Sequence, residues 1–144
     1  MKLTNQLHRH YNLYLSCAWN YNSMNKDLHD LLGAREDFRY RSIYLSPQHA
    51  VFQTNDERKI YESIRSKIKF CDAVIMLCGV YSNYSRWINK EIIACKDELN
   101  IPLIAVQRFD ANRTSQVMKE NADVIVNWQA DEIIAAIIQH ANKK

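Results

Sequence analysis

Three residues along one stretch of the chain, Ser85, Trp87 and Glu91, are the first candidates for chemistry in this sequence. Trp87 and Glu91 are four residues apart, so they share one face of a helix. Glu91 falls on the flank of the apolar stripe that runs from Ile88 to Leu99, where a carboxylate is at least half shielded from water. If this helix begins at Ser85, Glu91 lies roughly 9 Å along its axis at 1.5 Å per residue. A side chain at that distance still reaches a crevice at the end of the strand that precedes the helix. We therefore expect Glu91 to carry any chemistry that the chain performs.

Each of these residues could also have a purely structural role. Judged by position in the sequence alone, that role is favoured over a catalytic one. Glu91 can be a boundary residue that pairs with Lys90, Lys96 or a neighbouring arginine. Trp87 suits core packing as well as an aromatic wall, and Ser85 suits a helix cap. The spacing by itself leaves the function open.

Short apolar runs alternate with segments of helical period along the chain, which predicts five βα units on a parallel sheet. The expected strands are Asn12 to Ser16, Tyr40 to Leu45, Ala73 to Cys78, Pro102 to Val106 and Asp123 to Val126. The expected helices are Ser23 to Leu32, one opened by a capping box of Thr54 and Glu57, Ser85 to Leu99, Ser115 to Asn121 and Asp131 to Ala141. The pattern predicts an α/β three-layer sandwich with a central parallel five-stranded sheet, formed by residues 1–144 as a single domain.

The composition excludes several classes of protein. The net charge is +3, and basic residues are interleaved with acidic ones, so we expect no nucleic-acid partner. No apolar run approaches the ~20 residues that span a bilayer, and the N-terminus lacks a signal peptide, so we expect a cytoplasmic protein without a membrane partner. The four cysteines have neither CxxC spacing nor a nearby histidine set, so we expect no metal site. Cys71, Cys78 and Cys95 lie in apolar surroundings and are expected to be buried, reduced thiols, with Cys17 as the exception.

Ligands of open α/β sheets bind beyond the carboxyl ends of the strands, where strand order reverses. The loops expected at that edge are Ser16 to Tyr21, Ser46 to Gln53, Cys78 to Trp87, Gln107 to Arg113 and Asn127 to Gln129. Dinucleotide fingerprints and phosphate loops need several glycines, and the chain has only Gly33 and Gly79. We therefore expect no resident cofactor.

Taken together, these motifs resemble TIR-like domains, and most strongly the TIR-like proteins of the Thoeris antiphage system. The run from Leu13 to Trp19 is similar to the family's first strand and loop. The Ser85-x-Trp87-x-x-x-Glu91 helix resembles the segment that holds the catalytic glutamate of NAD-consuming members. Cys17 departs from the family, in which many members carry histidine or tyrosine. The resemblance implies a flavodoxin-like fold over nearly the whole chain.

The resemblance also implies that the chain cleaves the nicotinamide N-glycosidic bond of NAD and makes a cyclic ADP-ribose-type signal. NAD would be a substrate and not a cofactor, and a separate effector protein would sense the product. Glu91 would be the catalytic residue. The substrate-binding residues would be Ser16, Cys17, Ala18, Trp19, Ser46 and Trp87. The segment Ser46 to Gln53, with its apolar tip, would serve as a lid or a self-association contact.

Two other functions remain open. A TIR-like adaptor would act only by assembling with partners, and its function would survive replacement of Glu91. A nucleoside deoxyribosyltransferase-like enzyme would share the fold type and a glutamate but would turn over nucleosides. Fold analogy alone does not choose among these three.

Overall fold

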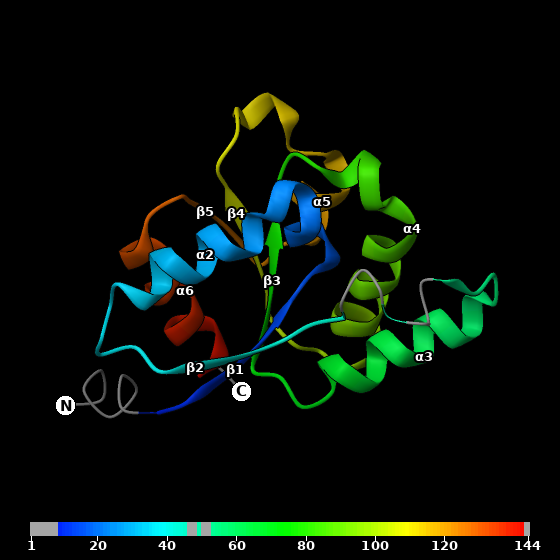
Figure 1. The fold of residues 1–144 in the computed structure, drawn as a ribbon, viewed down its shortest axis with the longest axis horizontal. Coiled ribbons are helices and arrows are strands. Elements are labelled where there is room, and N and C mark those ends of the chain that lie inside the picture. Colours follow the sequence, from blue (N-terminus) through cyan, green and yellow to red (C-terminus); the bar gives the residue numbers. More distant parts are fainter. Residues whose placement is uncertain (1–8, 46–48, 50–52, 143–144) are drawn as a thin grey trace.

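Five strands form one parallel sheet in the computed structural model, which describes residues 9–45, 49 and 53–142 (Figure 1). The strand order is β2-β1-β3-β4-β5, and every neighbouring pair is parallel. The bounds are β1 Tyr11–Leu15, β2 Tyr40–Ile43, β3 Ala73–Leu77, β4 Leu103–Gln107 and β5 Val124–Asn127. The flavodoxin-like α/β fold that the sequence predicts is confirmed, and the strand order reverses between β1 and β3.

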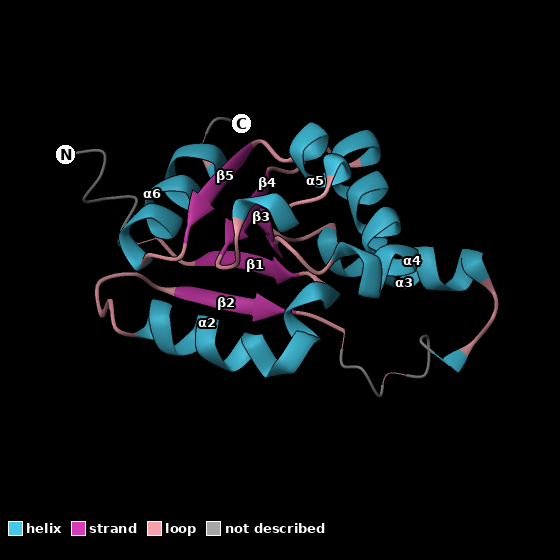
Figure 2. Cartoon of the chain, turned by 90° about the horizontal axis from the view of Figure 1, so that it is seen from above, coloured by secondary structure: helices cyan, strands magenta, loops and turns pink. Residues whose placement is uncertain are grey.

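Helices lie on both sides of the sheet (Figure 2). One pair, α2 and α6, packs together, and α3 packs against α4. In Figure 1 the first pair lies to the left of the strands and the second to the right. The helices are η1 Cys17–Ser23, α2 Met24–Gly33, α3 Glu57–Ile68, α4 Tyr81–Ile92, η3 Ile93–Glu98, η4 Ala111–Arg113, α5 Gln116–Asn121 and α6 Ala130–Ala141.

The core forms where apolar stripes of the helices meet the central strands. All five residues of β3 are buried because the strand lies between β1 and β4 and is covered on both faces. The α3 stripe of Ile60, Ile64 and Ile68 is fully buried, as its spacing predicts. This packing fixes the carboxyl edge of the sheet, where the loops after β1, β3 and β4 come together.

One predicted helix start is wrong, and a second helix has an additional turn before its predicted start. Asp56, and not Thr54, caps α3: its carboxylate accepts hydrogen bonds from the backbone N–H groups of Arg58 and Lys59. The helix of Glu91, α4, is assigned from Tyr81, but helical geometry breaks at Tyr84, so the regular helix that holds Glu91 begins at Ser85 as predicted. It continues beyond Ile92 as the π-helical segment η3, so the long α-helix expected up to Leu99 is two segments of different type.

No helix in the described part of the chain is long and apolar enough to cross a membrane. All four cysteines are buried and free of disulfides, which confirms the prediction for Cys71, Cys78 and Cys95 and shows that Cys17 is buried as well.

Candidate active site

The Glu91 carboxylate is enclosed by the end of β1 and the start of η1. The side chain of Glu91 is 0% exposed. The hydroxyl groups of Tyr14 and Ser16 donate to its two oxygens over 2.8 and 2.5 Å. The backbone N–H of Cys17 donates to it over 3.0 Å, and the Cys17 Sγ lies 3.7 Å away. Three strong donors from one short stretch of chain therefore converge on a carboxylate that the sequence places about 75 residues later.

This enclosure lies at the point where the strand order reverses. The backbone N–H of Ser16 bonds to the Ile75 carbonyl over 3.0 Å, which ties the end of β1 to β3. Tyr14 and Ser16 are two residues apart, so both side chains point to the face of the sheet that α4 covers. Open α/β sheets bind their ligands at such a reversal.

Burial raises the pKa of Glu91 above its ordinary value, and the hydrogen bonds from Ser16, Cys17 and Tyr14 oppose that rise. The pKa values of Tyr14 and Cys17 are raised well above their ordinary values, first by burial and then by the neighbouring Glu91 charge. Both groups therefore stay protonated at neutral pH, which suits them as donors to the carboxylate.

Neither lysine considered as a partner of Glu91 fills that role. Lys90 forms an ion pair with Glu57 on α3, and Lys96 pairs with Asp123 over 2.6 Å. The alternative of a boundary glutamate paired with these lysines is wrong, because both lysines are paired with other carboxylates and Glu91 is bonded to Tyr14, Ser16 and Cys17. Its partners are uncharged.

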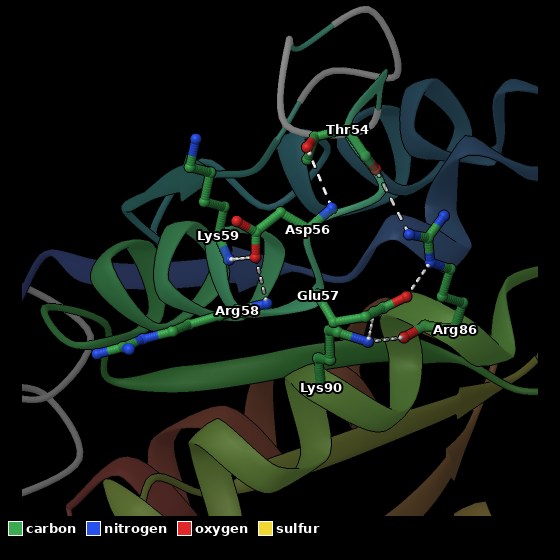
Figure 3. Close-up of polar contacts among 7 residues, drawn as sticks. All are labelled: Thr54, Asp56, Glu57, Arg58, Lys59, Arg86 and Lys90. Atoms are coloured by element: carbon green, nitrogen blue, oxygen red, sulfur yellow. Dashed lines mark hydrogen bonds and ion pairs between the residues drawn. The ribbon is translucent and has the colours of Figure 1, made fainter.

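A polar cluster holds α4 to the start of α3 (Figure 3). Glu57 lies between Arg86, at 2.9 Å, and Lys90. Arg86 also donates to the Thr54 carbonyl over 3.4 Å, so the chain that enters α3 is attached to the helix of Glu91. Glu57 therefore acts in helix–helix contact and not in the capping box that the sequence predicts.

The first-loop residues predicted to bind substrate are covered in this structure. Cys17 is buried and Ala18 is 0% exposed. The Trp19 side chain is 1% exposed, its indole N–H donates to the Ile75 carbonyl over 2.9 Å, and its ring lies 6.2 Å from the Trp128 ring. In this arrangement these residues hold η1 on the sheet, and a substrate reaches them only if η1 moves.

The other two predicted residues are placed differently. Trp87 is half-buried on α4, with the Arg86 guanidinium 5.8 Å from its ring centroid. Ser46 lies outside the described residues, as does most of the segment Ser46 to Gln53. The structure thus brings Ser16 and Cys17 directly to Glu91.

Tyr14 is the functional candidate that the sequence reasoning missed. It lies inside an apolar strand, where a tyrosine is easily taken for core packing. The available signal was its position two residues before Ser16, because residues i and i+2 of a strand share a face.

The one group of this site that could act in catalysis is the Glu91 carboxylate, and its hydrogen-bond donors are neutral. Among the residues that the structure describes, no group of three or more His, Cys, Asp or Glu side chains is placed to hold a metal ion. An open depression of about 370 Å³ lies elsewhere, lined by Asp27, Asp30, Leu31, Ala34, Arg108 and Trp128. Trp128, one of its lining residues, lies against Trp19 of η1.

Comparison with known proteins identifies the family of this site. The chain matches none of the curated proteins. The family model described as Thoeris protein ThsB, TIR-like domain, matches residues 14–114. That range includes the donors Tyr14, Ser16 and Cys17 together with Glu91. Because the match spans most of the sequence, this chain belongs to the TIR-like domain family of the Thoeris protein ThsB.

Proposed function

We propose that this Thoeris TIR-like protein cleaves the nicotinamide N-glycosidic bond of NAD and converts the ADP-ribose to a cyclic signal in antiphage defence. The observation that supports it best is the Glu91 carboxylate, which Tyr14, Ser16 and Cys17 hold at the strand reversal. Family membership supports a role in the Thoeris defence system. A separate effector protein would sense the product.

One carboxylate is enough for this reaction. Glycosidases that release an alcohol use a second carboxyl group to protonate the leaving oxygen. Nicotinamide leaves from a cationic pyridinium with the bonding electron pair and is neutral when released, so no general acid is needed. The ionised Glu91 would bind the ribose hydroxyls and stabilise the positive charge that develops at the ribose anomeric carbon. A nucleophilic atom of the ADP-ribose would then form the new bond to that carbon and close the ring.

Access to Glu91 requires a conformational change. Its carboxylate is fully buried and its oxygens are engaged by three donors, so NAD contacts it only when Ser16 and Cys17 withdraw. We propose that the structure is the closed state, and that opening of η1 exposes the carboxylate. Closure over a bound intermediate would also exclude water, which favours cyclisation over hydrolysis.

The complete enclosure of Glu91 also favours a second function. A carboxylate with no exposed surface and a full set of donors is what a purely structural glutamate shows. In that case the chain is an adaptor that acts by assembly. Self-association through the segment Ser46 to Gln53 is compatible with both the enzymatic function and the adaptor function.

The test is chromatography with mass detection of NAD incubated with the wild-type chain, Glu91→Gln and the control Glu120→Gln. Glu120 is exposed on α5, so its replacement removes the same charge without touching the site. We expect nicotinamide and an ADP-ribose product from wild type and Glu120→Gln only. The product mass separates cyclisation from hydrolysis.

The same three proteins are compared in cells challenged with phage. If no NAD is consumed in either setting while Glu91→Gln still protects cells, the adaptor function replaces the enzymatic one. Turnover of nucleosides instead of NAD would indicate the deoxyribosyltransferase-like reaction.

A further inference from the structure

A second group of residues meets at the same edge of the sheet, and we call it the rim cluster: Tyr21, Gly79, Phe109 and Arg113. It joins η1 to the loops that follow β3 and β4. The rings of Tyr21 and Phe109 meet edge to face, with centroids 6.1 Å apart. The Arg113 guanidinium lies 4.2 Å from the Phe109 ring centroid and donates to the Gly79 carbonyl over 3.1 Å.

Gly79 allows the two loops to approach each other. Its φ is +93°, a backbone conformation that residues other than glycine rarely adopt. A Cβ at this position would lie 3.1 Å from the Phe109 ring and 3.4 Å from the Arg113 Cβ. The close contact therefore depends on glycine, and it fixes the base of the Arg113 side chain.

Arg113 differs from the cations near it in having no acidic partner among the described residues. Arg108, on the same loop, pairs with Asp27 over 2.7 Å, and Arg86 and Lys90 share Glu57. The contacts of the Arg113 guanidinium are a carbonyl and an aromatic ring, neither of which neutralises its charge. The Arg113 side chain is exposed, and a guanidinium has five N–H donors. Arg113 is therefore able to form bidentate hydrogen bonds with an anion.

The rim cluster and the Glu91 enclosure share the short segment η1. Cys17, at one end of η1, donates to Glu91, and Tyr21, four residues on, contacts Phe109. A ligand with a ribose at Glu91 and an anionic group next to that ribose would extend along η1 to Arg113. A dinucleotide has this order of groups, since its diphosphate follows the nicotinamide ribose.

We propose that Arg113 binds the diphosphate of the dinucleotide substrate, with Phe109 and Gly79 orienting its guanidinium. The assignment rests on the proposed function for the identity of the ligand. It adds to that function a substrate-binding residue on the loop after β4, beyond the segments that surround Glu91.

The test is titration calorimetry with ADP-ribose on the full chain, comparing wild type, Arg113→Gln, Arg113→Lys and the matched control Arg108→Gln. Loss of a charged hydrogen-bonding partner corresponds to roughly a tenfold to hundredfold weaker Kd, so we expect that for Arg113→Gln. Arg113→Lys keeps the positive charge but loses the bidentate geometry of the guanidinium. Its Kd for ADP-ribose should therefore lie between those of wild type and Arg113→Gln. Arg108→Gln should stay within about twofold of wild type.

Salt dependence provides a readout that a merely structural role would not change. Raising sodium chloride should weaken ADP-ribose binding by wild type and affect Arg113→Gln much less, because screening acts on the charge that the variant lacks. Thermal unfolding of each variant is measured alongside.

The proposal is overturned if Arg113→Gln binds ADP-ribose as tightly as wild type, or if Arg113→Gln and Arg108→Gln weaken binding equally. It is also overturned if wild type binds no ADP-ribose. NAD turnover by wild type is scored separately. Binding that depends on Arg113 without NAD turnover would refute the proposed function and leave the anion site standing.

Discussion

The Ser16 hydroxyl donates to the Glu91 carboxylate over 2.5 Å, and this bond joins the loop after the first strand to the helix after the third. The same hydroxyl oxygen accepts the backbone N–H of Ala18 over 3.2 Å, so Ser16 caps η1 while it holds Glu91. One side chain therefore couples the shape of the first loop to the carboxylate, and movement of η1 necessarily changes the surroundings of Glu91.

Replacing Ser16 with alanine should destabilise the fold. The substitution leaves one oxygen of a buried carboxylate without its hydroxyl donor and removes the cap of η1, at a cost of roughly 1 to 3 kcal/mol. Urea unfolding measures the change. Ser66→Ala is the matched control, because Ser66 is exposed and its hydroxyl donates to the Ser63 carbonyl within α3, so its loss should change little. Equal stability of Ser16→Ala and wild type would mean that the bond contributes nothing net.

The raised pKa of Glu91 predicts how stability depends on pH. Because burial makes the folded state hold this proton more tightly than the unfolded chain, the free energy of unfolding falls as pH rises from about 4.3, the unfolded value, up to the folded pKa. Above that pKa the loss is complete. Glu91→Gln lacks this titration, so its stability relative to wild type should increase across the same window.

Urea unfolding of wild type and Glu91→Gln between pH 4 and 8 measures this difference, with Glu120→Gln as the exposed control. Glutamine is a suitable replacement because its carbonyl can accept from Tyr14 and Cys17 while its amide faces the Ser16 hydroxyl. A difference that stays constant with pH, or that changes in the opposite direction, would contradict the prediction.

Trp19 should behave as a core residue in stability measurements. Trp19→Phe removes the hydrogen bond to the Ile75 carbonyl and part of a side chain that is 1% exposed, which should cost roughly 1 to 3 kcal/mol. Trp87→Phe, at a half-buried position, should cost less. If thermal unfolding ranks the two variants the other way, η1 is held on the sheet by contacts other than Trp19.

Much of the fold could be predicted from the sequence because apolar runs and helical stripes are local signals. The strand of residues 73–77 is one example: five consecutive apolar residues favour burial on both faces, which an inner strand of a parallel sheet provides. The helix of Glu91 shows the limit. No side chain caps the turn that begins at Tyr81 or the π-helical segment after Ile92, so the sequence holds no local capping signal for either.

The candidate site was predicted in part for the same reason. The position of Glu91 beside an apolar stripe indicated a shielded carboxylate, and the placement of Ser16 at a strand end indicated the same crevice. Complete burial of Glu91 and the role of Tyr14 could not be read from spacing, because both depend on the contact of two segments about 75 residues apart.

The Glu57 bridge between α3 and α4 should stabilise the fold only while Glu57 is ionised. Its hydrogen bonds with Lys90 and then Arg86 lower its pKa, so its contribution is present above the unfolded pKa and is lost as pH falls through the folded value. Glu57→Gln should therefore lower the Tm at pH 7 and low salt. The decrease should be smaller at pH 3, and smaller at pH 7 in 1 M salt.

Glu62→Gln is the control for this bridge, since Glu62 pairs with Arg58 within α3 and joins no second helix. Its effect on the Tm should be smaller. An unchanged Tm for Glu57→Gln at pH 7 and low salt would show that α3 and α4 are held by their apolar contacts alone.

Gly79→Ala should damage the fold and the anion site together. An alanine at φ +93° is strained, and its Cβ would press on Phe109, so we expect a loss of roughly 1 to 3 kcal/mol in urea unfolding. Displacement of Phe109 and Arg113 should also weaken ADP-ribose binding, as Arg113→Gln does. Gly33→Ala is the matched control: it lies in α2, a Cβ there meets nothing within 4 Å, and alanine favours the helix. If Gly79→Ala is destabilised but binds ADP-ribose like wild type, the close packing of the two loops serves stability alone.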